Sequence, residues 1–158
     1  DGGLHYTETG QVSKRFDEGD IILQSEISVL SNETLETLSI RMQLTARDLL
    51  ARFLKDHEAL YKDKKPQIGG EYWPMPKAED RTIDWNQDIE TIDRMVRAFS
   101  KFETYCWIED KKYYVRKADC WVEEHLYQPG TLVHETNLER VYTAKDGFVC
   151  LSDWRKAD

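Results

Sequence analysis

One carboxylate, Asp17, stands where a side chain could do chemistry, at the mouth of a predicted strand. The segment Asp17-Glu18-Gly19-Asp20 leads directly into the apolar, β-branched run at residues 21–23. A carboxylate held on such a loop can act as a general acid or base. It can also cap a turn in which Gly19 supplies a positive φ, and the spacing alone favours this structural role. The elements around Asp17 must therefore decide between the two roles.

The first half of the chain predicts two strands and a long helix around this loop. Residues 3–6 form a short strand candidate, and the polar residues 7–16 predict a loop or an extended hairpin. Residues 21–30 predict a strand in a covered sheet. Residues 31–34, Ser-Asn-Glu-Thr, offer an N-cap, since Ser and Asn side chains accept bonds from helix amides, for a helix of about 30 residues with one apolar face. The pattern leaves open whether that helix breaks near Asp56.

The second half predicts a linker, a helix and a small β-rich domain. Residues 67–81 are rich in glycine and proline, which predicts a linker. Residues 88–100 predict an amphipathic helix capped by Asn86 or Asp88. Several short strands follow between residues 105 and 151, with turns at residues 109–112 and at Asp146-Gly147. Large aromatic residues dominate small cores, so we expect three tryptophans to fill this one: Trp107, Trp121 and Trp154.

Composition restricts the functional classes. The net charge is −8; residues 1–65 contribute 9 basic and 12 acidic residues, and residues 66–158 contribute 13 and 18. Neither half has the positive charge that generic polyanion binding requires, although a local basic patch is compatible with these totals. Three widely spaced cysteines predict buried, reduced thiols and a cytosolic compartment. The histidine and cysteine spacing predicts no metal site.

Chain length and hydropathy give two more expectations. No apolar run approaches the roughly 18 residues of a membrane-spanning helix, so we expect no membrane association. The chain begins Asp-Gly-Gly without an initiator methionine, which predicts a fragment or a processed protein.

Two segments resemble signatures of the folate-dependent formyltransferases. The first is a glycine at position 2 or 3, His5, a loop, and the run Asp17-Glu18-Gly19-Asp20-Ile21, followed by Thr34-Leu35 at a helix start. The second is Pro76 to Asn86, with a basic residue, Glu-Asp and Ile-Asp-Trp, followed by Met95-Val96-Arg97-Ala98. The resemblance weakens after about residue 105. The second signature is found in family members with an added C-terminal domain, the methionyl-tRNA and sugar N-formyltransferases.

The resemblance implies a fold and a division of the chain. Residues 1–65 would be the C-terminal part of a Rossmann-like catalytic domain of the α/β class. Residues 66–158 would hold the linker, a helix and a small antiparallel β domain that resembles an OB fold. In this arrangement the apolar faces of the strand and of the long helix would lack a partner. Four apolar residues would then be exposed: Ile22, Leu35, Leu38 and Met42.

The resemblance also implies formyl transfer from 10-formyltetrahydrofolate to a primary amine. In the family an Asn and a His stabilise the oxyanion, and an Asp orients the His and helps to move a proton. Asp17 matches this Asp, and His5 matches a supporting strand His nearby. The Asn-x-His-Pro-Ser motif of the family lies upstream and is absent from this sequence. We therefore expect the chain alone to be inactive.

The remaining site predictions concern the cofactor and the acceptor. The family holds the pterin through the loop before the Asp, so the candidate folate contacts are Lys14, Arg15, Phe16, Glu18 and Gly19. The His5-to-Asp17 interval of twelve residues is longer than in the family, which places their geometry in doubt. Tyr72 and Trp73 are candidates for stacking on a nucleotide base of the substrate, although core packing is the favoured interpretation. For Trp85 we expect packing of the linker onto the second helix, and for Arg97 an ion pair with Asp84 or Asp80.

Three interpretations of the whole chain remain. The acidic balance favours a nucleotide-linked amino sugar as the acceptor, because transfer RNA would call for a basic surface. Methionyl-tRNA is the alternative acceptor. In a third interpretation the chain is a non-catalytic, OB-like module whose aromatic strands, at Tyr113, Tyr114 and Trp121, bind a partner or nucleic acid. We also consider a homodimer.

Overall fold

The chain divides into two compact units, which are described separately. The computed structural model describes residues 4–10, 19–69 and 71–157. The N-terminal unit comprises Asp1–Trp73 and the C-terminal unit Pro74–Asp158. This division falls inside the glycine- and proline-rich segment that the sequence predicts as a linker. A domain boundary after residue 65 stays a prediction.

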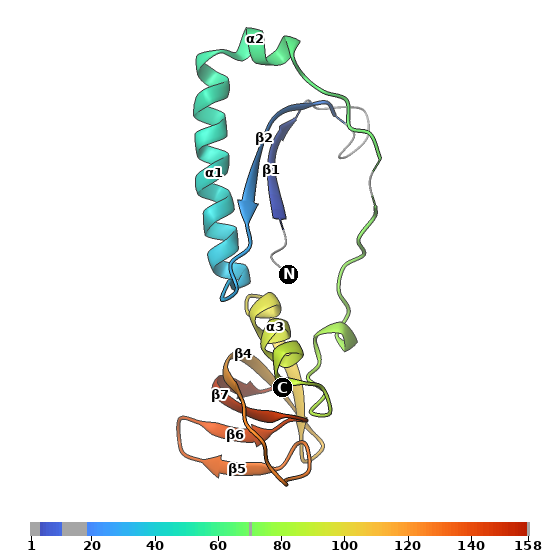
Figure 1. The fold of residues 1–158 in the computed structure, drawn as a ribbon, viewed down its shortest axis with the longest axis vertical. Coiled ribbons are helices and arrows are strands. Elements are labelled where there is room, and N and C mark those ends of the chain that lie inside the picture. Colours follow the sequence, from blue (N-terminus) through green and yellow to red (C-terminus); the bar gives the residue numbers. More distant parts are fainter. Residues whose placement is uncertain (1–3, 11–18, 70, 158) are drawn as a thin grey trace. The chain divides into compact units, whose positions relative to one another are not determined.

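The N-terminal unit contains a β-hairpin packed against a long helix (Figure 1). Strands β1 (Leu4–Gly10) and β2 (Ile21–Ser28) pair in antiparallel register from Leu4 opposite Ser28 to Gly10 opposite Ile21. Strand β1 therefore extends four residues beyond the predicted strand. Both described strands are antiparallel, so the parallel βαβ part of a Rossmann-like domain does not lie within them.

The predicted long helix is present, but it breaks at Asp56. Helix α1 (Leu35–Lys55) ends where Asp56 takes a non-helical conformation, with φ −144° and ψ 45°, and α2 (His57–Lys62) follows. The N-cap is Thr34, the last residue of the predicted capping segment 31–34, and its hydroxyl accepts from the Thr37 N–H; Ser31 and Asn32, whose side chains were expected to cap, do not. Thr34 acts as the cap because its backbone is extended and its side chain completes a reciprocal capping box with Thr37.

The apolar face of α1 is covered by the hairpin, which corrects one expectation. Four residues expected to be exposed are half-buried instead: Ile22, Leu35, Leu38 and Met42. Leu49, on the same side of the helix, is fully buried. The opposite face of α1 carries four apolar residues that are about half exposed or more: Ile40, Leu44, Leu50 and Leu54. The sequence pattern identified the inward face correctly but assumed that the hairpin would leave it open.

The C-terminal unit is built on a five-stranded antiparallel sheet (Figure 1). The strand order is β3-β4-β7-β6-β5. No pairing between β3 and β5 occurs among the residues that the structure describes, so the OB-like closed barrel stays a prediction. The strand bounds are β3 (Thr104–Ile108), β4 (Lys111–Val122), β5 (Leu132–Glu135), β6 (Arg140–Thr143) and β7 (Gly147–Lys156).

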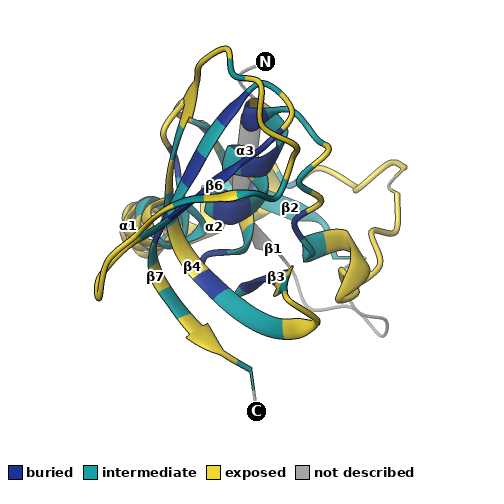
Figure 2. Cartoon of the chain, turned by 90° about the horizontal axis from the view of Figure 1, so that it is seen from below, coloured by how far each residue is buried: buried dark blue, intermediate teal, exposed yellow. Residues whose placement is uncertain are grey.

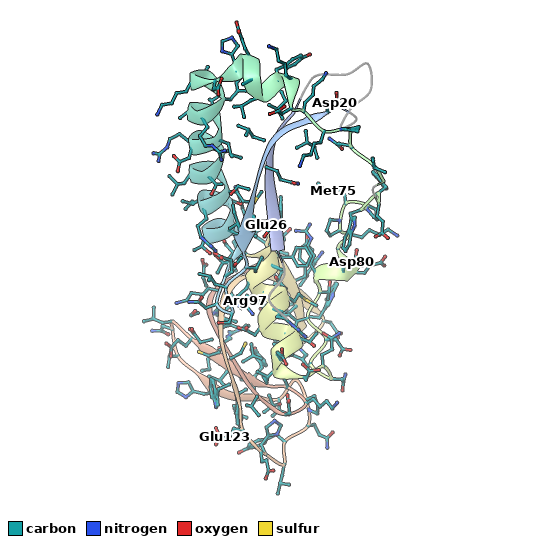
Figure 3. All side chains as sticks on the ribbon, turned by 45° about the horizontal axis from the view of Figure 1, so that its top comes forward. Asp20, Glu26, Met75, Asp80, Arg97 and Glu123 are labelled. Carbon is teal, nitrogen blue, oxygen red and sulfur yellow. The ribbon has the colours of Figure 1, made fainter. Side chains whose placement is uncertain are left out.

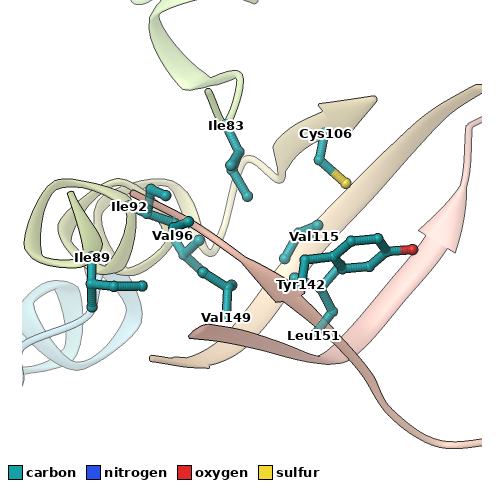
Figure 4. Close-up of a cluster of buried hydrophobic side chains, with 10 residues drawn as sticks. Ile83, Ile89, Ile92, Val96, Cys106, Val115, Tyr142, Val149 and Leu151 are labelled. Atoms are coloured by element: carbon teal, nitrogen blue, oxygen red, sulfur yellow. The ribbon is translucent and has the colours of Figure 1, made fainter. Parts of the chain in front are cut away.

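Helix α3 (Ile89–Phe99) packs its apolar face on this sheet, as its pattern predicts (Figure 2). Asp88 caps it by accepting a hydrogen bond from the Thr91 N–H at 2.8 Å. A second carboxylate, Asp146 in the β6–β7 turn, accepts from the Ile89 N–H at 2.8 Å. Figure 4 shows the core between helix and sheet, which includes Ile83, Ile89, Ile92, Val96, Cys106, Val115, Tyr142, Val149 and Leu151.

Two of the three tryptophans do not fill this core as expected. Trp107 is 54 % exposed and Trp121 is 40 % exposed, whereas Trp154 is half-buried, contacts Tyr113 and packs against the core, as predicted. Most of the core is formed by aliphatic side chains from α3 and the strands. Trp85 packs against the core cluster that includes the α3 side chains, and it also stacks on Tyr142 at 5.1 Å between ring centroids.

The three cysteines are free thiols. Cys106 is fully buried, and Cys120 and Cys150 are half-buried. Burial raises the pKa of Cys106 and of Cys120 to about 12, so both remain protonated at neutral pH. These thiols are therefore poor nucleophiles, in agreement with the structural role predicted for them.

The β3–β4 turn offers a stabilising substitution. Glu109 and Asp110 connect the strands as a two-residue turn with φ of 48° and 60°. This conformation favours Asn-Gly, because side chains other than Gly, Asn and Asp are strained there. We expect Glu109→Asn with Asp110→Gly to stabilise the C-terminal unit by about 1 kcal/mol, or about 4–8 °C in Tm. Thermal melting monitored by circular dichroism measures the effect.

A charge-matched variant separates turn geometry from electrostatics in that test. Glu109→Gln with Asp110→Ser removes the same two charges without a residue suited to positive φ. An equal gain in both variants would show that charge, and not backbone strain, governs this turn.

Candidate functional site

The predicted catalytic loop joins the two strands of the hairpin. Gly10 and Ile21 are paired, so the segment between them begins and ends at the same end of the hairpin. Asp17 and four predicted folate contacts (Lys14, Arg15, Phe16 and Glu18) lie outside the described residues, and their roles stay predictions. His5 lies in β1 opposite Ile27, and Gly19 lies two residues before β2.

The end of this loop is held by the segment that follows α2. The Ile21 N–H donates to the Lys65 carbonyl at 2.7 Å, and the Lys65 N–H donates back to the Ile21 carbonyl at 2.9 Å. The Gln67 side-chain amide donates to the Gly19 carbonyl at 2.9 Å. We call these contacts between residues 19–21 and 64–67 the loop clamp.

An ion pair completes the loop clamp. Lys64 Nζ lies 3.0 Å from the carboxylate of Asp20 and 4.6 Å from the centre of the Tyr61 ring (Figure 3 labels Asp20). The hydrogen bond with Asp20 raises the pKa of Lys64 above its ordinary value. Sequence analysis missed this contact with the loop, because no local pattern reports pairing across more than 40 residues.

The other end of β2 is fixed by the start of α1. Glu33 is buried, accepts from the Thr37 hydroxyl at 2.5 Å and forms an ion pair with Arg41. Arg41 also donates to the Ser28 carbonyl at 3.1 Å. These contacts tie the last residue of β2 to the first turns of the helix. Strand β2 is therefore held at both ends, which gives the loop before it a defined anchor.

This buried carboxylate predicts acid sensitivity. The hydrogen bond from Thr37, followed by those from Leu30 and Arg41, lowers the pKa of Glu33 below its ordinary value of 4.5. A lowered pKa stabilises the fold above pH 4.5, and this stability is lost as the pH falls below that value. We expect Glu33→Gln to reduce the acid sensitivity of the N-terminal unit and its stability at pH 7.

Melting temperatures between pH 7 and pH 3 test the prediction for Glu33. Glu26→Gln is the matched control, because Glu26 is an exposed glutamate on β2 (Figure 3). If Glu33→Gln and the unaltered chain lose the same stability between pH 5 and pH 3, Glu33 does not govern the acid response. Asp84 and Asp88, whose pKa values are lowered by hydrogen bonds from Asn86 and Thr91, remain unchanged in all variants.

The predicted substrate-stacking residues are exposed. Tyr72 is 90 % exposed and Trp73 is 83 % exposed, so the favoured interpretation of core packing is wrong for both. Ile68 and Met75, in the same extended segment, are also more than 80 % exposed. Stacking of Tyr72 or Trp73 on an acceptor stays a prediction.

Residues of the second signature, 76–86, attach the linker to the sheet of the C-terminal unit. Ile83 is buried and its N–H donates to the Tyr105 carbonyl at 2.7 Å, which pins this segment to β3. Asp84 accepts from the backbone and side-chain amides of Asn86. Arg97 pairs with Asp93, one helical turn earlier, at 2.8 Å, so the predicted pairing with Asp84 or Asp80 is wrong. A neighbour at i−4 on the same helix is simply closer.

Cationic and aromatic side chains alternate on one face of β3, β4 and β7. Tyr105, Tyr114 and Arg155 are cross-strand neighbours. Lys112 Nζ lies 3.7 Å above the Tyr105 ring centre, and the Arg81 guanidinium lies 4.7 Å from the same centre. Arg155 lies 4.7 Å from the Tyr114 ring centre. We call these five residues the basic-aromatic ladder.

Arg155 of the ladder is paired with a carboxylate, and the ladder adjoins an exposed indole. Glu103 accepts from Arg155 at 3.1 Å. Trp107, paired with Lys112 across the strands, is more than half exposed. Tyr113, named in the sequence interpretation, points to the other face and packs on Trp154. Lys112 and Tyr114 are two residues apart on β4 and therefore share a face. The sequence alone does not reveal the ladder, because the pairing of β4 with β3 and β7 must be known first.

Two further findings concern metals and membranes. Within the described residues, no group of three His, Cys, Asp or Glu side chains is placed to hold a metal ion. None of the helices described here combines the length and apolarity needed to cross a membrane.

Comparison with known proteins identifies the family. The model of the family described as "Formyl transferase, C-terminal domain" matches residues 76–158. The methionyl-tRNA formyltransferase of Pseudothermotoga lettingae is 29% identical over 146 residues, which cover 90% of this chain and 47% of that protein. The chain spans about half the length of the curated relatives that it matches.

Solved structures show the same fold. A variant of HypX from Aquifex aeolicus matches with a TM-score of 0.77 and 21% identity, over 98% of this chain and 29% of HypX. WlaRD, a sugar 3N-formyl transferase, matches with a TM-score of 0.62 and 15% identity, over 98% of this chain and 56% of WlaRD. With the family match over more than half of its residues, the chain belongs to the formyl transferase family and contains its C-terminal domain.

Proposed function

We propose that this chain is part of an N-formyltransferase that moves a formyl group from 10-formyltetrahydrofolate to a primary amine. The observation that carries the proposal is the family match over residues 76–158. The structure of WlaRD was determined in the presence of 5-N-formyl-THF, which supports a folate as the formyl donor. The third interpretation, a non-catalytic binding module, has no comparable support.

The folate supplies an activated formyl group when bound, and this chain would supply the residues around it. Residues 14–19 would hold the pterin, and Gly19, which is described, is fixed by Gln67. Asp17 would orient a catalytic imidazole and accept the proton released as the amine nitrogen bonds to the formyl carbon. The bond between that carbon and N10 would then break, and N10 would take up a proton as tetrahydrofolate leaves.

Two acceptors are supported by different observations. The structure of WlaRD, determined in the presence of dTDP, supports the amino-sugar nucleotide favoured by the net charge of −8. The methionyl-tRNA formyltransferases among the relatives support methionyl-tRNA. The cations of the basic-aromatic ladder and the exposed Trp107 beside it support the RNA as well, because cations bind phosphates and an exposed ring stacks on a base. Net charge is a weak argument where the charges are distributed unevenly.

A chimera tests the function and separates the acceptors. The matched part of the Pseudothermotoga lettingae enzyme is replaced by this chain, and formyl transfer from 10-formyltetrahydrofolate is measured with methionyl-tRNA and with a dTDP-linked amino sugar. Turnover of one acceptor above that of the truncated enzyme supports the proposal and names the substrate. A chimera that is folded by circular dichroism and transfers to neither acceptor contradicts it.

Ladder variants then test whether the RNA contacts this face. We expect Lys112→Ala with Arg155→Ala to raise KM for methionyl-tRNA about tenfold and to flatten its salt dependence. Lys101→Ala, an exposed lysine outside the ladder, is the matched control. An unchanged salt dependence in the double variant would remove the ladder as support for the RNA acceptor.

A further inference from the structure

The face of α1 that points away from the hairpin carries a row of exposed side chains. They lie at every third or fourth position along the helix: Ile40, Leu44, Arg47, Ala51 and Leu54. We call these five residues the outer seam. We propose that the outer seam is a homodimer interface, in which α1 packs against α1 of a second copy of this chain in antiparallel orientation.

The composition of the outer seam is unusual for a surface helix. Ile40, Leu44 and Leu54 are large apolar side chains that are about half exposed or more. Leu49 is buried on the other side of the same helix, so α1 has apolar residues on two opposite faces. A helix at the surface of a domain normally has one apolar face, and a helix that is apolar on all sides is buried. We therefore expect the outer seam to be covered in solution.

The spacing of the outer seam fits a partner helix. Its five residues follow one another at intervals of four, three, four and three, which is the a/d pattern of a coiled coil. Helix α1 has 21 residues and is about 32 Å long, so the pattern extends over most of its length. An apolar row with this period stays on one side of a helix and packs against a second helix of similar length.

The layers of the N-terminal unit indicate that the partner helix belongs to another molecule. The hairpin already covers the inner face of α1. In a layered domain a helix packs one face on its sheet, and further strands extend the sheet beside the existing ones. The outer seam therefore lies on the outside of its layer. A second copy can cover it with the same surface, as in the two-fold interfaces of most homodimers.

Arg47 decides between the two possible orientations of the helices. In a parallel pair Arg47 would meet Arg47 of the second copy within the seam, where like charges repel and lack solvent. In an antiparallel pair with Ile40 opposite Ala51, Arg47 lies opposite Leu44 instead. The aliphatic part of the arginine side chain then covers the leucine, and its guanidinium reaches solvent at the edge.

The charges beside the outer seam are self-complementary in this antiparallel register. Asp48, which borders the seam, comes next to Arg41 of the second copy, and the two-fold symmetry forms this opposite-charge pair twice. Asp48 is well exposed and paired only with the equally exposed Arg47, at 3.1 Å, among the contacts of the described residues. It can therefore turn to a second copy without losing a buried contact.

Sedimentation equilibrium of the 158-residue chain tests the interface. One helix pair is smaller than a standard protein interface, so we expect a micromolar dissociation constant and a dimer of twice 18.6 kDa at about 200 µM. Leu44→Glu places a charge in the apolar seam and should raise the dissociation constant about tenfold or more. Leu126→Glu is the matched control, because Leu126 is a fully exposed leucine of the C-terminal unit, and this variant should remain dimeric.

Disulfide cross-linking tests the orientation. An antiparallel pair predicts a cross-linked dimer when Ile40→Cys and Ala51→Cys chains are mixed and oxidised, and far less cross-linking in either variant alone. A parallel pair would instead cross-link Ile40→Cys with itself. The unaltered chain gives the background, which should be low because the thiols of Cys106 and Cys120 are buried and, with a pKa of about 12, protonated.

Each result bears on the proposal, and none depends on formyl transfer. Circular dichroism first shows that the Leu44→Glu chain keeps its helix content. An unaltered chain that is monomeric at about 200 µM overturns the inference. A dimer that Leu44→Glu leaves intact also overturns it, because that dimer forms through another surface. Cross-linking of Ile40→Cys alone contradicts the antiparallel register.

Discussion

Replacing Asp17 with Asn should lower kcat of the chimeric enzyme about a hundredfold to ten-thousandfold, the range contributed by general acid–base groups. Asn keeps the size and much of the hydrogen bonding of Asp but cannot accept a proton or stabilise an imidazolium. Binding should change far less, so KM for the folate should stay within about threefold. Single-turnover kinetics, which exclude product release, measure the chemical step directly.

The matched control for Asp17→Asn is Glu26→Gln on the neighbouring strand, an exposed carboxylate for which we expect full activity. Melting curves of both variants show whether the loop change affects folding. A loss in kcat below about tenfold would assign Asp17 to the turn-capping role that its spacing alone favours.

Replacing Gly147 with Ala should destabilise the C-terminal unit by about 3 kcal/mol or more. An added Cβ would lie 2.1 Å from the Trp121 carbonyl oxygen and 2.9 Å from both Val122 Cα and Ile89 Cγ1. Two of these atoms belong to the backbone of the paired strand β4, so no side-chain rotation relieves the clash. The strands must separate at the point where the turn also caps α3. A decrease in Tm of about 10–20 °C follows for a unit of this size.

Gly69→Ala is the comparison for the Gly147 variant. Its φ of 81° carries a backbone penalty, but a Cβ there meets nothing within 4 Å. We expect a loss of about 1 kcal/mol, measured by urea denaturation. Similar losses at the two glycines would mean that β4 and β7 adjust freely and that close packing at the turn is not essential.

Sequence patterns were reliable where one element determines its own conformation. Helix α3, its Asp88 cap and the Asp146-Gly147 turn were all predicted, because the relevant side chains lie within a few residues of each other. The predicted pairing of Arg97 was wrong although Asp93 is also local: Asp93 lies one turn earlier on the same helix, whereas Asp80 and Asp84 precede that helix.

Patterns were unreliable where tertiary contacts decide the outcome. The exposure of Trp107 and Trp121 depends on which strand face α3 covers, and no local pattern contains that information. Gly19 and Gln67, which the loop clamp joins, are 48 residues apart in the sequence. The catalytic role of Asp17 was assigned only through the resemblance, whereas the contacts of Lys64 and Gln67 with residues 19 and 20 are seen only in the tertiary structure.

The extended segment with exposed Tyr72 and Trp73 has a consequence for handling the protein. Chymotrypsin cuts after large aromatic residues in exposed, extended chain, and these two side chains are 90 % and 83 % exposed. The Trp73–Pro74 bond resists the protease because proline follows the aromatic residue, which leaves the Tyr72–Trp73 bond as the point of attack. Preparations stored without protease inhibitors would therefore lose the intact chain first at the division between its two units.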